Sequence, residues 1–219
     1  VNHPDVASTS VNGTRDIDVL EGGTGDDTLN GGGDGDIYIF GLGDGNDVIN
    51  DDEDNEFRNG FDVLQFRDGI TQDDLTFTRD GTSTNITLGI DGTTDSVTIN
   101  GQFQATETGV FGTWWEDRIE IFAFDDGSGL NYNDIMDLTL QTYSTAGDDF
   151  LYGFDRADRL DAGLGNDYIS GGDYNDTYIF GLGYGQDTIR DNLENILTGD
   201  FDRVLFNADI SPEDIIFLP

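Results

Sequence analysis

The feature that most constrains this sequence is a glycine- and aspartate-rich unit that repeats every nine residues. Residues 22–30 read GGTGDDTLN, and the pattern continues directly in residues 31–39 as GGGDGDIYI. After a slip of two residues it returns in residues 42–50 as LGDGNDVIN, and residues 13–21 form a weaker copy. The shared pattern is G-G-x-G-x-D-x-U-x with U apolar, and such a tandem period indicates stacked copies of one small structural unit.

Each part of this unit has a defined structural role. Glycine at the first, second and fourth places allows the backbone to turn sharply and to bring its carbonyl oxygens inward. The aspartate at the sixth place adds a carboxylate, so the turn offers only hard oxygen ligands, which suit Ca²⁺. The last three places form a very short strand with one apolar side chain directed to one face. We therefore predict an all-β fold, a parallel β-roll in which every second unit stacks on its predecessor and metal ions lie between the stacked turns.

At these residues the sequence resembles the RTX family, the calcium-binding repeats of bacterial proteins exported by type I secretion. The resemblance implies Ca²⁺ as the cofactor, a secreted or cell-surface location and folding outside the cell. Stacked turns lie about 4.8 Å apart. Two unpaired carboxylates at that spacing repel by roughly 3–4 kcal/mol at an effective dielectric constant of about 20. A bound Ca²⁺ reverses this repulsion, so we expect the repeats to order only when the cation is present.

The same pattern recurs about 140 residues downstream. Residues 13–79 align without a gap with residues 153–219, and the alignment centres on YIFGLG at 38–43 and at 178–183. We therefore expect about one and a half tandem units of roughly 140 residues, cut from a longer modular protein. The expected divisions are a first roll block at 1–50, a β-rich extension with one short helix at 51–143, a second roll block at 144–190 and the start of a second extension at 191–219.

The extension is predicted to be mostly strands. Its strand-like runs, which alternate or are rich in β-branched and aromatic residues, are 62–66, 75–78, 86–90, 97–99 and 118–124. The pair Asp91-Gly92 is a hairpin-type turn signal. Residues 131–140 are predicted to form a helix with Asn131 or Asn133 as its N-cap. Runs 62–66 and 119–127 resemble the haemolysin-type calcium-binding-related segment that follows RTX repeats, which implies that the extension continues and caps the roll.

Because alternate turns lie on the same side of a roll, the turns sort into two edges. One edge keeps glycine at the fourth place, and its expected calcium ligands are Gly23, Gly25, Asp27, Gly43, Gly45, Asp47, Gly147, Asp149, Gly163, Gly165, Asp167, Gly183, Gly185 and Asp187. The other edge has Asp16, Asp34, Arg156 or Tyr174 at that place, so its sites are weakened. Weaker candidate ligands on that side are Asp18, Asp36, Asp62, Asp158 and Asp176. The guanidinium of Arg156 is expected to replace a cation. The apolar residues at the eighth place are expected to fill the core.

Charge and composition exclude several classes of function. The chain has 46 acidic and nine basic residues and a formal net charge of −37. Binding of nucleic acid or insertion into a membrane is therefore not expected. There is no cysteine to form disulfides, so metal would have to stabilise an extracellular fold instead. His3 is the only histidine, and no nucleophile motif is present, so the sequence predicts no enzyme.

The sequence favours a calcium-dependent structural or interaction module of a large, type I-secreted RTX exoprotein of the adhesin kind. One alternative is the C-terminal secretion and folding segment of an RTX exoenzyme or toxin. A second alternative is a carbohydrate- or ice-binding module, which would use Trp114-Trp115 or a flat face of the roll. A carbohydrate or a cell-surface ligand is accordingly a candidate partner beside calcium.

Overall fold

The computed structural model describes residues 8–51, 60–104, 118–191 and 201–218, together with the backbone of two short strands at 108–109 and 112–113. His3 and the Trp114-Trp115 pair lie outside the described residues. The chain divides into two compact units, Val1–Ile135 and Met136–Pro219, and each is treated by itself below. Helix α1 (Tyr132–Thr142) contains the boundary between them.

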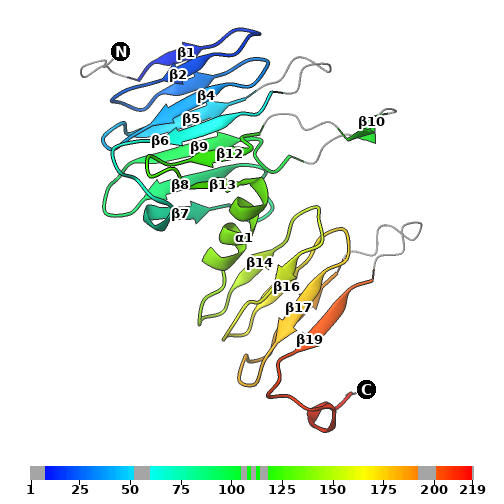
Figure 1. Ribbon diagram of the computed structural model, residues 1–219. Helices are drawn as coiled ribbons and strands as arrows, with labels where there is room; N and C mark the ends of the chain where they lie inside the picture. The colour runs from blue at the N-terminus through cyan, green and yellow to red at the C-terminus, as the bar shows by residue number, and fades with distance from the viewer. Residues whose placement is uncertain are drawn as a thin grey trace. The chain divides into compact units, whose positions relative to one another are not determined.

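The first unit is built from two sheets whose strands alternate along the chain (Figure 1). The first sheet has the order β1-β3-β5-β9-β8-β7, formed by β1 (Ser10–Asn12), β3 (Thr28–Asn30), β5 (Asn46–Asn50), β9 (Ser96–Asn100), β8 (Ile86–Ile90) and β7 (Leu75–Thr78). The second has the order β13-β12-β6-β4-β2, formed by β2 (Val19–Glu21), β4 (Ile37–Phe40), β6 (Val63–Phe66), β12 (Ile121–Ala123) and β13 (Gly129–Asn131). All pairs are parallel in the repeat region, so the predicted parallel β-roll is confirmed.

The core of this unit lies between the two sheets. The eighth-place residues of the repeats are fully buried, as predicted: Leu20, Leu29, Tyr38 and Ile49. Burial of each such apolar side chain contributes about 1.5–3 kcal/mol. Aromatic rings continue the stack, since Phe66 lies edge-on to Phe40 at 6.3 Å and parallel to Phe124 at 5.3 Å between ring centroids.

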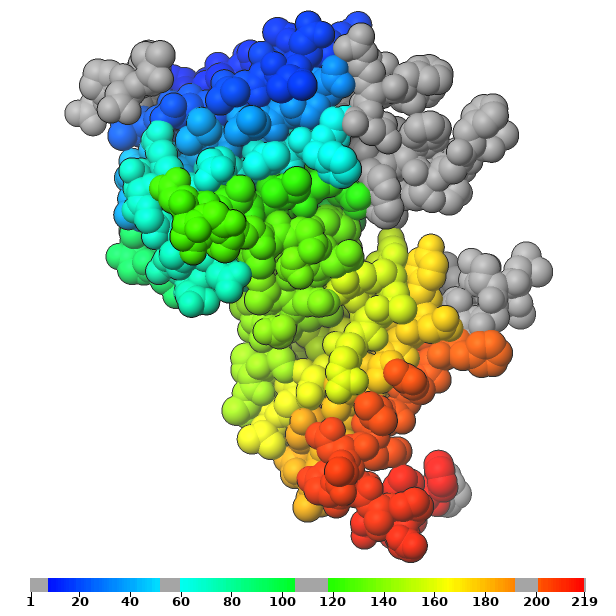
Figure 2. All heavy atoms as spheres, in the orientation of Figure 1, coloured from blue at the N-terminus to red at the C-terminus, as the bar shows by residue number. Residues whose placement is uncertain are grey.

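The extension continues the roll rather than forming a separate layer. Strand β6 pairs in parallel with β4, β12 pairs in parallel with β6, and β9 pairs in parallel with β5. The last pairs of both sheets are antiparallel, namely β9–β8, β8–β7 and β12–β13. Figure 2 shows this succession as bands of colour from blue to green across the unit. The extension therefore adds rungs to both sheets, as the resemblance implied.

Most local predictions for the extension are confirmed. Gly92 has φ +78° in the turn between β8 and β9. The strand expected at 118–124 is shorter, since only Ile121–Ala123 form it. Helix α1 begins after Asn131, whose Oδ1 accepts hydrogen bonds from the backbone N–H groups of Asn133 and Asp134 at 2.8 and 3.3 Å. The unit also contains β10 (Thr108–Gly109) paired with β11 (Gly112–Thr113) and the 3₁₀ turn η1 (Gln72–Asp74).

The second unit repeats the alternation of strands. One sheet joins β14 (Phe150–Tyr152), β16 (Tyr168–Ser170) and β18 (Thr188–Arg190), and the other joins β15 (Arg159–Leu160), β17 (Thr177–Phe180) and β19 (Arg203–Phe206), all in parallel. The 3₁₀ turn η2 (Pro212–Asp214) follows. The eighth-place residues Leu151, Leu160, Ile169 and Tyr178 are buried. Ile189 is 38 % exposed, contrary to the prediction that it fills the core, because β18 is an edge strand among the described residues.

Candidate metal sites

The sixth-place aspartates link each turn to the next. On the edge that carries Asp27 and Asp47 (the glycine-rich edge), the backbone N–H of Thr9 donates to Asp27 Oδ1 at 2.6 Å. The N–H of Asp27 donates in turn to Asp47 Oδ1 at 2.9 Å. On the opposite edge (the substituted edge), the N–H of Asp18 donates to Asp36 Oδ1, and the N–H of Asp36 donates to Asp62 Oδ1. The N–H of Asp62 donates in turn to Glu120 Oε2. One carboxylate oxygen of each aspartate therefore sets the register of stacked turns.

The second unit has the same two ladders. On its glycine-rich edge, Asp149 N–H donates to Asp167 Oδ1 at 2.9 Å, and Asp167 N–H donates to Asp187 Oδ1 at 3.1 Å. On its substituted edge, the N–H of Asp158 donates to Asp176 Oδ1 and the N–H of Asp176 donates to Asp202 Oδ1, both at 2.9 Å. Asp202 extends this ladder in the same way that Asp62 extends the ladder of the first unit.

The second oxygen of most of these carboxylates is buried without a hydrogen-bond partner in the described structure. The atoms concerned on the glycine-rich edges are Oδ2 of Asp27, Asp47, Asp167 and Asp187. On the substituted edges they are Oδ2 of Asp36 and Asp176. A buried charged oxygen without a partner is costly, and coordination to a cation would satisfy it. The residues present therefore fit a hard divalent cation.

Three predicted ligands differ from this pattern, because their second oxygen is used inside their own turn. Asp18 Oδ2 accepts from Thr14 N–H at 2.6 Å, and Asp149 Oδ2 accepts from Thr145 N–H at 2.8 Å. Asp158 Oδ2 accepts from Phe154 N–H at 2.6 Å. Asp149 therefore resembles Asp18 and Asp158 in its hydrogen bonding, although its turn keeps the glycine at the fourth place.

Close approach between turns requires glycine at the fourth place of the glycine-rich edge. Gly45 has φ +97°, and a Cβ built on it would collide with the carbonyl oxygen of Gly25. In the same way a Cβ on Gly165 would collide with the carbonyl oxygen of Gly147, and a Cβ on Gly185 with that of Gly165. Each carbonyl is thus directed at the turn above it. The second-place glycines of these turns also have positive φ: Gly23, Gly43, Gly163 and Gly183.

The substituted edge keeps the turn conformation without the glycine. Asp34 and Tyr174 have φ +65° and +77°, which is left-handed backbone that non-glycine residues adopt at a cost. Arg156 Nε contacts Asp158 Oδ1 at 2.8 Å, and the guanidinium also pairs with Asp137. A fixed cation therefore lies beside Asp158.

Two groups of three carboxylates combine the predicted candidates Asp36, Asp62 and Asp176 with residues that the repeat pattern did not single out. Oxygens of Asp36, Asp51 and Asp62 all lie within 4.8 Å of one another, and the same holds for Asp176, Asp191 and Asp202. Asp51, Asp191 and Asp202 were missed from the sequence. The signal that could have found them is the internal alignment, which places each member of the first group opposite one of the second.

Burial changes the acidity of these carboxyls. Burial, together with the nearby carboxylates of Asp27 and Asp44, raises the pKa of Asp47 to about 7. Burial likewise raises the pKa of Asp176 to about 7, with the charge of Asp158 and Asp202 adding to the effect. The pKa values of the remaining buried members are also raised, chiefly by burial: Asp36, Asp51, Asp62 and Asp187. Around neutral pH, protons therefore compete with a cation for these oxygens.

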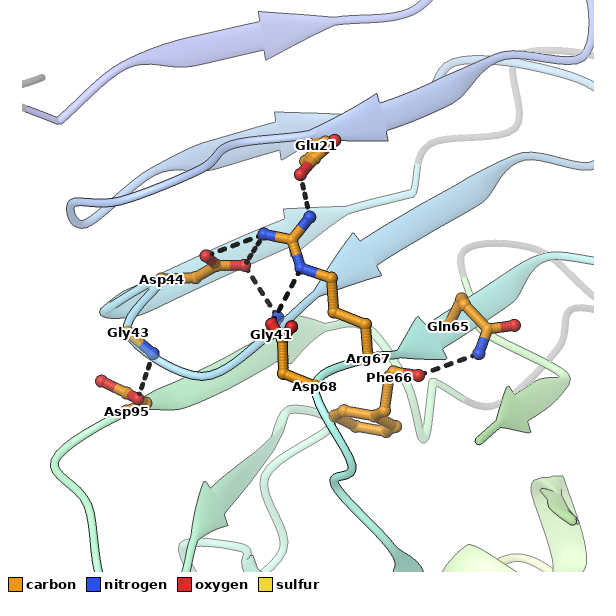
Figure 3. A network of polar contacts seen from close by, with 9 residues as sticks. All are labelled: Glu21, Gly41, Gly43, Asp44, Gln65, Phe66, Arg67, Asp68 and Asp95. Atoms are coloured by element: carbon orange, nitrogen blue, oxygen red, sulfur yellow. Dashed lines mark hydrogen bonds and ion pairs between the residues drawn. The ribbon is translucent and has the colours of Figure 1, made fainter. Parts of the chain in front are cut away.

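One arginine organises the acidic side chains beside the turn at 41–47 (Figure 3). The Arg67 guanidinium contacts both oxygens of buried Asp44 at 3.1 Å and also pairs with Glu21. Asp44 Oδ2 accepts the N–H of Gly41 at 2.7 Å, which closes the turn. In the second unit the aligned residues are Tyr184 and Asn207, and Asn207 Nδ2 donates to the Tyr184 hydroxyl at 3.3 Å. A neutral pair there takes the place of the ion pair.

Two comparisons with known proteins agree with this construction. Residues 85–134 match the family described as haemolysin-type calcium binding protein related domain. This stretch contains the run 119–127 on which the predicted resemblance rests, whereas 62–66 lies outside it. The chain is also 37% identical over 105 residues to the iron-regulated protein FrpA of Neisseria meningitidis serogroup C, a match that covers 48% of this chain and 8% of FrpA. These matches confirm the predicted resemblance to haemolysin-type calcium-binding proteins over the parts of the chain that they cover.

Proposed function

We propose that this chain is a calcium-dependent structural and interaction module of a large, type I-secreted RTX exoprotein of the adhesin kind. The observation that carries the proposal is the set of buried, unpartnered Oδ2 atoms of Asp27, Asp47, Asp167 and Asp187 on the glycine-rich edges. In this proposal each ion lies between two stacked turns and is held by these carboxylates and by turn carbonyls. Asp149, with Gly147, would contribute to the first such site of the second unit. The chain is not an enzyme in this proposal.

The chemistry of the sites agrees with an extracellular location. Carboxylate and carbonyl oxygens are the ligands that Ca²⁺ prefers, and extracellular calcium modules have dissociation constants of about 10⁻⁴–10⁻³ M. Cytosolic calcium would leave such sites empty, whereas millimolar external calcium would fill them and stabilise the fold by mass action. Among the described residues no helix combines the length and apolar character needed to cross a membrane. The formal net charge of −37 also opposes binding to nucleic acid.

A calcium titration followed by circular dichroism tests the proposal. The chelated chain should lose most of its β signal, and millimolar Ca²⁺ should restore it. Mg²⁺ at the same concentration should restore little, because it requires compact octahedral geometry and loses its water reluctantly. A β signal that is unchanged by chelation would contradict the proposal. The alternative that the chain is the secretion and folding segment of an RTX exoenzyme or toxin predicts a catalytic motif in the sequence that precedes it.

A second candidate function is the binding of a neutral polysaccharide on the outer face of the first sheet. Partly exposed side chains that pair across neighbouring strands there are Thr28, Val48, Thr98, Thr87 and Thr78. Beside them runs a ladder of amides in which Asn30 donates to Asn12, Asn50 to Asn30 and Asn100 to Asn50, at 2.7, 2.8 and 2.7 Å. These two rows carry no charge in a strongly acidic chain. A glycan array with the calcium-loaded protein tests this function, and loss of any signal in Thr98→Asp would support it, whereas unchanged binding would contradict it.

A further inference from the structure

The group Asp36–Asp51–Asp62 lies where the repeat block passes into the extension. Asp51 directly follows β5. Because Asn50 pairs with Asn30, Asp51 occupies the first place of its turn, the place that Gly31 occupies in the neighbouring turn. Asp62 precedes β6 and takes the sixth place of the same turn, because its Oδ1 accepts the N–H of Asp36 at 2.6 Å. The three carboxylates therefore come from the end of one strand and the starts of two others.

Three oxygen atoms, from Tyr38, Asp36 and Asp51, lie beside the Cα of Gly31. The Tyr38 hydroxyl donates to Asp51 Oδ1 at 2.7 Å. A Cβ built on Gly31 would collide with the Tyr38 hydroxyl, with Asp36 Oδ2 and with Asp51 Oδ1. An Asp62 oxygen lies within 4.8 Å of the oxygens of the other two carboxylates. The glycine thus leaves a space that is lined by oxygens from separate strands.

The three carboxylates are buried, and each accepts a hydrogen bond on Oδ1, from Asp18 N–H, Tyr38 O–H and Asp36 N–H respectively. Asp36, Asp51 and Asp62 are 0, 3 and 2 % exposed. Oδ2 of Asp36 and Oδ2 of Asp51 have no hydrogen-bond partner in the described structure. Within the part of the chain that the structure describes, no arginine forms an ion pair with any of the three carboxylates. An isolated group of three buried acids is unfavourable unless protons or a cation neutralise it.

We infer that Asp36, Asp51 and Asp62, with the Tyr38 hydroxyl, form a divalent cation site of a different construction from the sites between glycine-rich turns. Its ligands are carboxylates from the first and sixth places and a phenol oxygen, with no need for fourth-place glycine. Hard oxygen ligands select Ca²⁺ or a lanthanide, and affinity rises with the number of charged ligands. The site therefore fills at a lower calcium concentration than the turn sites and joins β4, the end of β5 and the start of β6.

The second unit contains a similar arrangement, in which Asp176 is buried while Asp191 and Asp202 are partly exposed. Oxygens of Asp176, Asp191 and Asp202 lie within 4.8 Å of one another, and Asp176 Oδ2 is buried without a partner. The Tyr178 hydroxyl donates to Asp191 Oδ1 at 3.2 Å and accepts the N–H of Gly171 at 3.0 Å. A Cβ on Gly171 would collide with Asp176 Oδ2 and with the Tyr178 hydroxyl. The chain therefore has one such site for each roll block.

The inference rests on the proposed calcium binding, but it can fail separately. The test compares the full-length chain with Asp51→Asn, Asp191→Asn and the double variant, and counts bound Ca²⁺ by equilibrium dialysis. Each single variant should lose one ion and the double variant two, and the lost ions should be those that bind at the lowest calcium concentration. Asp80→Asn, at an exposed position outside both groups, is the matched control and should keep the full count. Asp47→Asn, on the glycine-rich edge, should keep the tightest ions and lose a weaker one.

A second set of measurements distinguishes loss of the ion from loss of the fold in a variant. In chelator, Asp51→Asn should keep at least as much residual β signal as wild type, because it removes a buried like charge, whereas in Ca²⁺ it should be less stable. Tb³⁺ luminescence excited through tyrosine should fall in Tyr38→Phe, which retains the ring in the core. An unchanged ion count in Asp51→Asn, or a gain in stability that is equal with and without Ca²⁺, would overturn the inference and leave the turn sites standing. A wild-type chain that binds no Ca²⁺ would overturn the inference and the proposed function together.

Discussion

The backbone N–H of Asp27 donates to Oδ1 of Asp47 at 2.9 Å, and Oδ2 of the same Asp47 carboxylate is buried without a partner. One oxygen therefore holds two turns in register while the other is left for a ligand. The same division of the two oxygens occurs between Asp167 and Asp187 in the second unit. Under the proposed function, register and metal affinity both depend on this one side chain, so a change at this position should affect both.

Asp167→Ala should raise the calcium midpoint of folding more than Asp158→Ala does. Asp167 accepts the N–H of Asp149, and its Oδ2 is buried without a partner among the described residues, whereas Asp158 is already paired with Arg156. Loss of a ligand to a buried site costs about 1–3 kcal/mol, which corresponds to roughly a 5- to 150-fold shift in affinity. Calcium titrations of the two variants by circular dichroism measure this difference. Equal midpoints would show that the two edges do not differ in the way proposed.

Gly45→Ala should destabilise the calcium-loaded chain more than Gly92→Ala. Both residues have positive φ, so each substitution carries a backbone cost of about 1–2 kcal/mol. Only at Gly45 would the new Cβ also collide with a backbone atom, the carbonyl oxygen of Gly25, whereas nothing lies within 4 Å at Gly92. Thermal unfolding in millimolar Ca²⁺ should therefore show a lower midpoint for Gly45→Ala. A similar loss in both variants would mean that the two turns do not nest as closely as described.

The calcium-free chain should gain β structure as the pH falls. Burial raises the pKa values of Asp47 and Asp176 to about 7, above the value of about 3.9 in an unfolded chain. The folded state therefore binds more protons than the unfolded state, and stability decreases as the pH rises from about 4 through 7. Circular dichroism in chelator should show more β structure at pH 5 than at pH 8, and Ca²⁺ should remove this dependence. The opposite trend in chelator would contradict the assignment of these carboxyls as buried and unpaired.

Arg67→Ala should cost more stability than the double variant Arg67→Ala with Asp44→Asn. The single variant leaves the buried Asp44 carboxylate without its ion pair, while the double variant removes the charge as well. Because Arg67 is partly exposed, the difference should be about 1–2 kcal/mol rather than the larger cost of a deeply buried pair. Urea unfolding in Ca²⁺ measures it. If the double variant were the less stable one, the pair would matter for its packing and not for its charge.

The roll could be predicted from the sequence because the repeat determines both the turn and the strand. The eighth-place apolar residues, the alternation of sheets, the N-cap at Asn131 and the neighbourhood of Arg156 and Asp158 all follow from local pattern. The acidic groups could not be predicted in this way. Asp51 is recognisable as a first-place residue of the repeat only when β5 and β3 are known to pair. Its partner Asp62 lies eleven positions further along the chain, outside the spacing of the nonapeptide.

Two other differences have separate causes. The second oxygen of Asp149 is occupied because Thr145 happens to place its N–H and hydroxyl within reach, at 2.8 Å each. Ile189 stays partly exposed because its strand has a neighbour on one side only within the described residues. The exposure of Ile189 therefore depends on the neighbouring rungs, whereas the bonding of Asp149 is local to its own turn, where Thr145 stands at the place that glycine holds in other turns.

The location of bound Ca²⁺ in a crystal structure tests the central claim most directly. Anomalous difference density from crystals grown in millimolar Ca²⁺ should place ions between the turns that end at Asp27 and Asp47 and between those that end at Asp167 and Asp187. A further ion is expected between the turns of Asp149 and Asp167. Density confined to the substituted edge beside Asp158 and Asp176, or no calcium density beside any repeat turn, would contradict the account.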